Sequence, residues 1–144
     1  MSDSSSNPVD VAARALKHRD RSRRQIDDRL ARAGVDEDAR TDALETLERI
    51  GYLDDARFAG RRAEALAARG YGDEAIRAAL GSEGVADELA EAALRGLDPE
   101  ADRARHIVAN AGASPRTFTN LVRKGFSEES VGAAGGFAEP DERA

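Results

Sequence analysis

The sequence predicts an all-α protein, built as tandem three-helix units that follow one another in an extended row. Three observations support this fold class. Apolar residues recur three and four residues apart along most of the chain, and no segment alternates between apolar and polar residues as a strand would. Leu, Ile, Val and Phe supply only 26 of the 144 residues, too few for one thick core. We therefore expect about nine helices in three small cores.

The first unit is predicted over residues 9–51, after a disordered lead at residues 1–8 that is rich in Ser, Asp and Asn. Its first helix spans residues 9–19. Ser22 is a suitable N-cap for the second helix, and Gly34 closes that helix twelve residues later. Glycine suits this position because it adopts the left-handed conformation that ends a helix without a side-chain clash.

The second unit is predicted over residues 52–97, with a first helix at residues 54–69. Gly72 opens the second helix and Gly84 closes it, again twelve residues apart. The return of the same opening and closing pattern at the same spacing indicates tandem units.

The third unit is predicted over residues 98–137, with a first helix at residues 99–111. Ser114 and Pro115 open the second helix as an N-cap followed by proline at the first helical position. Gly125 closes this helix eleven residues after Ser114. The third unit therefore repeats the pattern of the other two.

The third helix of each unit begins at acidic residues, which complement the positive end of the helix dipole. The last of these helices, near residues 127–137, contains three glycines. Each costs about 1 kcal/mol relative to alanine in a helix interior, so we expect this helix to fray. A charged, disordered tail is predicted at residues 138–144. The acidic starts are Asp36, Glu37 and Asp38; Asp87 and Glu88; and Glu128 and Glu129.

The apolar faces of these helices define a predicted core. Truncation of a fully buried member to alanine should cost roughly 2–5 kcal/mol, enough to unfold a small unit. The predicted core residues are Leu30, Leu47, Ile50, Phe58, Leu66, Ile76, Leu80, Ile107 and Leu121.

The composition excludes several classes of function. The chain has no cysteine, so disulfides and thiolate sites are excluded. Its two histidines, His18 and His106, lie in no catalytic or metal-binding motif, and no phosphate-binding loop is present. We expect no enzyme activity, metal, cofactor or small-molecule substrate. The absence of an apolar membrane span and of a signal peptide favours a cytoplasmic protein with no membrane partner.

Basic residues are concentrated in three stretches, although the net charge is −6. If the units stack in similar orientations, these stretches could align into a basic stripe that meets phosphates or a carboxylate-rich protein. The alternative is a set of solvated helix faces that pair with the acidic third helices. The candidate partner-binding residues are Arg21, Arg23, Arg24, Arg57, Arg61, Arg62, Arg116, Arg123 and Lys124.

Several motifs together resemble a known family. Residues 47–59 read Leu-Glu-Arg-Ile-Gly-Tyr-Leu-Asp-Asp-Ala-Arg-Phe-Ala, and residues 69–72 read Arg-Gly-Tyr-Gly. With Arg-Ser-Arg at residues 21–23 and Leu-Val-Arg-Lys-Gly-Phe-Ser at residues 121–127, they resemble the RecX family of recombinase regulators. The likeness covers residues 11–131, most of the chain.

The resemblance implies three-helix repeats in a curved, elongated shape and binding to the RecA recombinase filament on single-stranded DNA. It further implies that the protein mostly inhibits ATP hydrolysis and strand exchange, and so regulates recombination, DNA repair and the SOS response. Direct contact with single-stranded DNA is expected to be weak or absent, because the pI is near 5.0 and only 4% of residues are aromatic. The alternatives are a stand-alone helix-turn-helix-like DNA-binding module and a generic helical adaptor.

Overall fold

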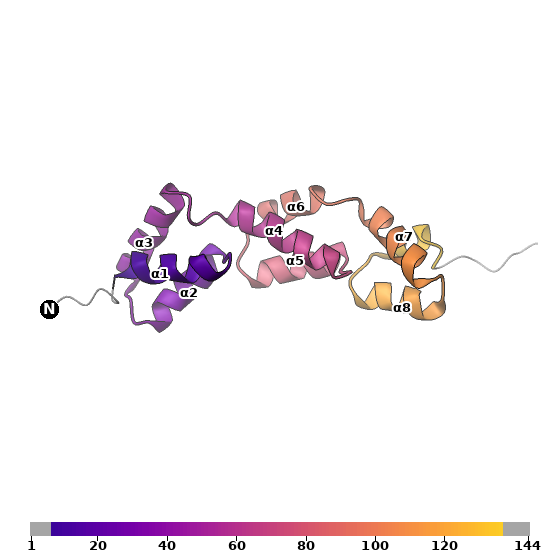
Figure 1. The fold of residues 1–144 in the computed structure, drawn as a ribbon, viewed down its shortest axis with the longest axis horizontal. Helices are drawn as coiled ribbons and strands as arrows, with labels where there is room; N and C mark the ends of the chain where they lie inside the picture. The colour runs from indigo at the N-terminus through magenta and orange to yellow at the C-terminus, as the bar shows by residue number, and fades with distance from the viewer. Residues whose placement is uncertain (1–6, 137–144) are drawn as a thin grey trace, which may run out of the picture.

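The computed structural model describes residues 7–136, which form nine α-helices and no strand. These helices pack in three successive groups of three. Figure 1 shows the groups one after another in an elongated row. The predicted all-α tandem repeat is therefore confirmed. The helices are α1 (Pro8–His18), α2 (Arg23–Arg32) and α3 (Glu37–Arg49); α4 (Asp55–Ala68), α5 (Asp73–Ser82) and α6 (Asp87–Arg95); and α7 (Glu100–Ala111), α8 (Pro115–Arg123) and α9 (Glu128–Ala133).

Short polar side chains cap most of the helix starts. Ser22 forms a capping box at α2: its Oγ accepts from the Gln25 backbone N–H at 3.2 Å, and Gln25 Oε1 accepts from the Ser22 backbone N–H at 3.0 Å. Ser114 caps α8 immediately before Pro115, as predicted. Gly72 stands at the predicted start of α5, where it provides no side-chain cap.

The first helix begins earlier than predicted. Pro8 is the first residue of α1, and Asn7 is its N-cap, with Oδ1 accepting from the Val9 backbone N–H at 3.0 Å. The sequence predicts a disordered lead that includes both residues, but a capping asparagine followed by proline is a favourable helix start. Residues 1–6 of the predicted lead, and the predicted tail at residues 138–144, lie outside the described residues.

Left-handed glycines end the second helix of every unit. Gly34, Gly84 and Gly125 have φ values of +86°, +90° and +93°, as the sequence predicts. In each case the next residue donates its backbone N–H to the carbonyl five residues earlier, which closes the helix with a Schellman-type bond. These bonds run from Val35 to Leu30, from Val85 to Leu80 and from Phe126 to Leu121, at 3.1, 3.0 and 3.0 Å.

Each group of three helices encloses its own core, and the third core is the smallest. Its buried apolar members are Ala104, Leu121, Phe126 and Val131. The first and second cores are larger and are centred on Leu30 with Leu47 and on Ile76 with Leu80, respectively. The predicted core is confirmed at Leu30, Leu47, Phe58, Leu66, Ile76, Leu80 and Leu121, all of which are buried.

Two core predictions are wrong. The side chain of Ile50 is 53% exposed because this residue is the C-cap of α3, one position beyond the helix. The chain turns back at Gly51, whose φ is +83°, so Leu53 fills the core at 2% exposure. Ile107 is only half-buried because it lies at the edge of the third core, toward Gly70 of the second unit.

The last helix is shorter than the predicted segment 127–137. α9 has six residues and ends at Ala133, and Gly135 follows in the left-handed conformation with a φ of +99°. Gly136 packs closely on the side chains of Val131 and Phe118, where a Cβ would clash. Gly135 and Gly136 therefore turn the chain back onto the third core, instead of loosening the interior of a helix. Residue 137 lies outside the described residues.

Candidate functional site

Two junctions hold the three units in a row. At the first junction, the backbone N–H of Arg23, the first residue of α2, donates to Asp55 Oδ1 at 2.7 Å. The Ser22 hydroxyl donates to the carbonyl of Glu83, the C-cap of α5. The second unit therefore accepts hydrogen bonds from the start of α2, where the first backbone N–H groups have no partner within the helix.

The second junction repeats the first. Asp73, the first residue of α5, donates its backbone N–H to Glu100 Oε2 at 2.7 Å. Gly72 donates its backbone N–H to the carbonyl of Lys124, the C-cap of α8, at 2.8 Å. Glu100 opens α7 as Asp55 opens α4, so the same positions of neighbouring units meet at both junctions.

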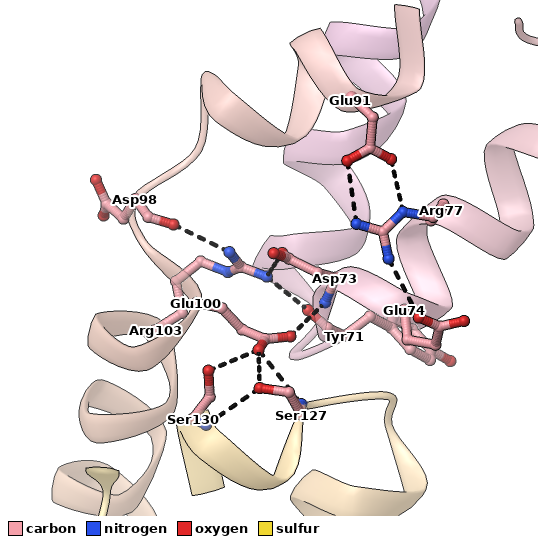
Figure 2. Close-up of polar contacts among 10 residues, drawn as sticks. All are labelled: Tyr71, Asp73, Glu74, Arg77, Glu91, Asp98, Glu100, Arg103, Ser127 and Ser130. Atoms are coloured by element: carbon pink, nitrogen blue, oxygen red, sulfur yellow. Dashed lines mark hydrogen bonds and ion pairs between the residues drawn. The ribbon is translucent and has the colours of Figure 1, made fainter. Parts of the chain in front are cut away.

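The Glu100 carboxylate is the centre of the second junction, as Figure 2 shows. Its Oε1 accepts from the hydroxyls of Ser127 and Ser130 at 2.8 and 2.6 Å, while Oε2 accepts from Asp73. Burial opposes ionisation of Glu100, but these hydrogen bonds together outweigh it and hold the pKa of the carboxyl below its ordinary value. The ionised carboxylate thus ties α9 and the second unit to α7.

Arg103 makes a second link across this junction (Figure 2). Its guanidinium donates to Asp73 Oδ1 and to the Asp98 carbonyl, both at 2.9 Å. The side chain is 11% exposed and lies over the Phe126 ring, 5.9 Å from the ring centroid. The contact between the second and third units therefore has both polar and aromatic components.

The two junctions should respond differently to acid. The lowered pKa of Glu100 stabilises the fold above the ordinary glutamate pKa of about 4.3, and this contribution is lost as pH falls through the lowered value. Burial instead raises the pKa of Asp55, because the effect of burial exceeds that of the hydrogen bond from the Arg23 backbone N–H. Protonation of Asp55 therefore does not remove a stabilising charge. As pH falls below about 4, we expect α7–α9 to lose amide-exchange protection before α1–α3.

Glu100→Gln provides the control for this acid response. The amide keeps one acceptor oxygen and cannot titrate, so the third unit should open more readily at neutral pH and lose its added sensitivity to acid. Simultaneous opening of all units in acid, or an unchanged acid response in E100Q, would contradict the assignment to Glu100.

A basic groove lies between the first two units and is lined by residues of α1 and α4. Figure 1 shows the C-terminal end of α1 near the start of α4. It consists of two adjoining hollows of about 570 and 360 Å³ that share Asp20 and Arg61. Asp10 and Asp20 are its acidic side chains. Six basic side chains outnumber them: Arg14, Lys17, Arg19, Arg57, Arg61 and Arg62.

Some of the basic side chains that line the groove form ion pairs or hydrogen bonds with other residues of the chain. Arg61 forms an ion pair with Asp20 at 2.6 Å. Arg57 donates to the carbonyls of Gly51 and Tyr52 at 3.1 and 3.2 Å, which fixes the loop between the two units. These arginines therefore hold the walls of the groove in place as well as contributing charge.

Other basic side chains of the groove form no such ion pair or hydrogen bond within the described residues. Arg14 and Lys17 are exposed on α1 and form no ion pair or hydrogen bond within residues 7–136. The side chain of Tyr52 is 55% exposed and lines the same hollow. With respect to the described part of the chain, the groove thus presents unpaired positive charge together with an aromatic ring.

The structure brings only some of the predicted site residues together. Arg57, Arg61 and Arg62 line the groove. The remaining candidates fall into three groups. Arg23, Arg24 and Lys124 lie at the junctions, where they contact Asp55, Ser82 and Arg69, respectively. Arg116 and Arg123 are exposed on α8. Arg21 lies just before α2.

Arg21 is distinct among the candidates. Its Nε is buried and has no hydrogen-bond partner among the described residues. Burial lowers the pKa of Arg21, and the neighbouring charges of Arg19, Arg29 and Arg32 lower it further. Each of these three arginines therefore disfavours the positive charge of Arg21.

Sequence reasoning missed the residues that organise these sites. Asp55 and Glu100 lie in the first turns of α4 and α7, and their partners are 32 and 27 residues away along the chain. Tyr52 lies within the family-like motif, but only the approach of α1 to α4 places it in a basic groove. Within residues 7–136, no group of three or more potential ligands is placed to hold a metal ion, and no helix could span a membrane.

Family models match two segments of the chain. Residues 10–47 match the first three-helix domain of RecX, and residues 54–94 match its second three-helix domain. Regulatory protein RecX of Chromohalobacter salexigens is 41% identical over 140 residues, which cover 91% of this chain and 92% of that protein. Regulatory protein RecX of Xanthomonas citri is 31% identical, with 88% and 85% covered.

Solved structures show the same fold. The crystal structure of RecX from Lactobacillus salivarius superposes with a TM-score of 0.77 at 18% identity, over 88% of this chain and 91% of that one. A second structure, of a regulatory protein RecX, gives a TM-score of 0.74 at 18% identity, over 94% and 80%. With two matching domain models, full-length relatives and a shared fold, this chain belongs to the RecX family of regulatory proteins.

Proposed function

We propose that this protein is a non-catalytic cytoplasmic regulator that binds the RecA recombinase and its filament on single-stranded DNA. In this role it limits ATP hydrolysis and strand exchange, and so modulates recombination, DNA repair and the SOS response. Membership of the RecX family supports the regulatory role. The observation that carries the proposal is the repeated junction, which sets three similar units in one row.

A row of similar units suits a partner that is itself a repeating assembly. A helical filament presents the same surface many times, so neighbouring units can engage neighbouring recombinase subunits. Each linked contact raises the effective concentration of the next, so weak contacts add to a useful affinity. The basic groove supplies a positive surface on an otherwise acidic protein, which favours association with a carboxylate-rich or phosphate-bearing partner.

The groove arginines provide a direct test. Replacing both Arg61 and Arg62 by glutamate should raise the concentration needed to inhibit DNA-dependent ATP hydrolysis by RecA roughly 5- to 30-fold, because exposed ion pairs contribute about 0.2–1 kcal/mol each and reversal adds repulsion. The measurement is ATP hydrolysis on single-stranded DNA with substoichiometric regulator. Circular dichroism should show that the variant stays helical.

Arg95 and Arg105 provide a control matched in charge. Both are exposed, lie on α6 and α7, and line neither hollow of the groove. Reversing both to glutamate changes the net charge equally and should leave inhibition near that of the unaltered protein. Equal loss in the two variants would assign the effect to net charge, and no loss in either would remove the groove from the interface.

The same assay separates the proposed role from a stand-alone DNA-binding module. Such a module would bind DNA tightly, with steep salt dependence, in the absence of recombinase. The proposed regulator should instead inhibit at well below one molecule per recombinase subunit while binding bare strands weakly. A wild-type protein that leaves RecA ATP hydrolysis unchanged would contradict the proposal.

A further inference from the structure

Among residues 7–136, the exposed aromatic side chain lies in the basic groove. Three large apolar side chains within residues 7–136 are half or more exposed: Ile50, Tyr52 and Val122, at 53%, 55% and 50%. Tyr52 is the aromatic one among them, and it lines the larger hollow between α1 and α4. Tyr52 therefore offers an aromatic face to a ligand in the hollow that Arg14 and Lys17 also line.

The groove also contains two cationic side chains that could bind an anion. Arg14 and Lys17 project from α1 without a carboxylate partner among the described residues. Across the groove, Arg61 is already paired with Asp20. A phosphate in this hollow could therefore bind Arg14 and Lys17 without breaking an ion pair formed among the described residues.

The loop that carries the Tyr52 ring is held to α4. The Arg57 guanidinium donates to the carbonyls of Gly51 and Tyr52 at 3.1 and 3.2 Å and thereby fixes this loop to α4. Ala13 and Leu16 of α1 line the same hollow and add apolar surface to it. A ligand that fits must present a flat apolar face and a nearby anion together.

We infer that this groove binds a short segment of single-stranded nucleic acid, with phosphates at Arg14 and Lys17 and one base stacked on Tyr52. Basic grooves with an exposed aromatic ring bind single strands in this way, largely without regard to sequence. A carboxylate-rich peptide would use the same cations but would leave the ring uncovered. The net charge of −6 opposes the approach of a polyanion, so binding should be weak and detectable at low salt.

This inference rests on the proposed function in one respect, because the strand would be the one on which the recombinase filament forms. Its test uses no recombinase, so its failure is distinguishable from failure of the ATP hydrolysis assay. A negative result with bare strands would leave inhibition of RecA intact, and a regulator that failed to inhibit could still bind a strand.

Tyrosine fluorescence gives a direct readout of stacking. The chain contains two tyrosines and no tryptophan. Tyr71→Phe therefore leaves Tyr52 as the sole emitting residue, and its emission should be quenched on titration with a thymidine oligonucleotide at low salt. A glutamate peptide of equal charge and inorganic phosphate serve as the two ligand controls, and neither should quench, because neither carries a base to stack.

Binding to the groove variants is measured with an end-labelled oligonucleotide, so that it does not depend on Tyr52 emission. Tyr52→Ala should weaken binding about fivefold or more, whereas Tyr52→Phe should retain it because the ring remains. Arg14→Ala with Lys17→Ala should lower both the affinity and the slope of log affinity against log salt, the slope by roughly 1.4. Arg95→Ala with Arg105→Ala is the control for two lost cations.

Three results would overturn the inference. The first is an oligonucleotide that neither binds nor quenches at low salt. The second is binding that Y52A and the Arg14 and Lys17 double variant leave unchanged. The third is a glutamate peptide that binds as tightly as the oligonucleotide and depends on the same cations, which would assign the groove to an acidic protein segment.

Discussion

Leu121→Ala is expected to unfold the third unit while the first unit stays folded. Leu121 is 2% exposed and is one of four buried apolar residues in the third core. Truncation of a fully buried leucine costs about 2–5 kcal/mol through lost burial and the cavity left behind. Because units in a row contact only their neighbours, the loss should stay near the third unit.

Val122→Ala is the control for this substitution. Val122 is the next residue of α8, but its side chain is 50% exposed, so its truncation should change stability by less than about 0.5 kcal/mol. Amide exchange resolved by residue measures both variants. We expect L121A to expose α7, α8 and α9 with protection of α1–α3 retained. Equal loss of protection in all nine helices would show that the units unfold as one.

Gly72→Ala is expected to separate the second and third units. The φ of Gly72 is −87°, which any residue adopts, so its effect would come from close approach alone. A Cβ at this position would lie 2.5 Å from both the Gly125 carbonyl carbon and the Phe126 nitrogen, which are backbone atoms. Overpacking of this kind costs about 1–3 kcal/mol, and here it would also displace the bond from Gly72 to Lys124.

Solution scattering measures this separation as an increase in the radius of gyration, and amide exchange should show loss of protection at the start of α5. Gly60→Ala is the matched control, because Gly60 is a helical position in α4 with open space around its Cβ. It should stabilise the protein by about 0.5–1 kcal/mol. A G72A variant with the scattering curve and melting temperature of the parent would contradict the packing described for this junction.

The helices and their ends could be predicted because their causes are local. Ser22 and Ser114 cap the residues that follow them, and Gly84 closes a helix by bonds within a few residues. The misassignment of Ile50 marks the limit of periodicity, which continues the apolar pattern past the last helical turn. Only the turn at Gly51 decides that Leu53 takes the buried position.

The candidate site was less predictable because it depends on contacts between units. The arginines of α4 could be selected by charge, but which of them have internal partners follows from the distant residues Asp20 and Glu83. Likewise, Glu100 satisfies donors from two other helices, which no local pattern indicates. Sequence can therefore identify the units and their basic stretches, while the geometry of the junctions and groove requires the fold.

The start of α8 has a consequence for self-association. At both junctions, the first residue of a second helix donates its backbone N–H to a carboxylate of the next unit, as Arg23 and Asp73 do. The equivalent residue of the third unit is Pro115, which has no N–H to donate. Another molecule therefore cannot extend the row by repeating this bond.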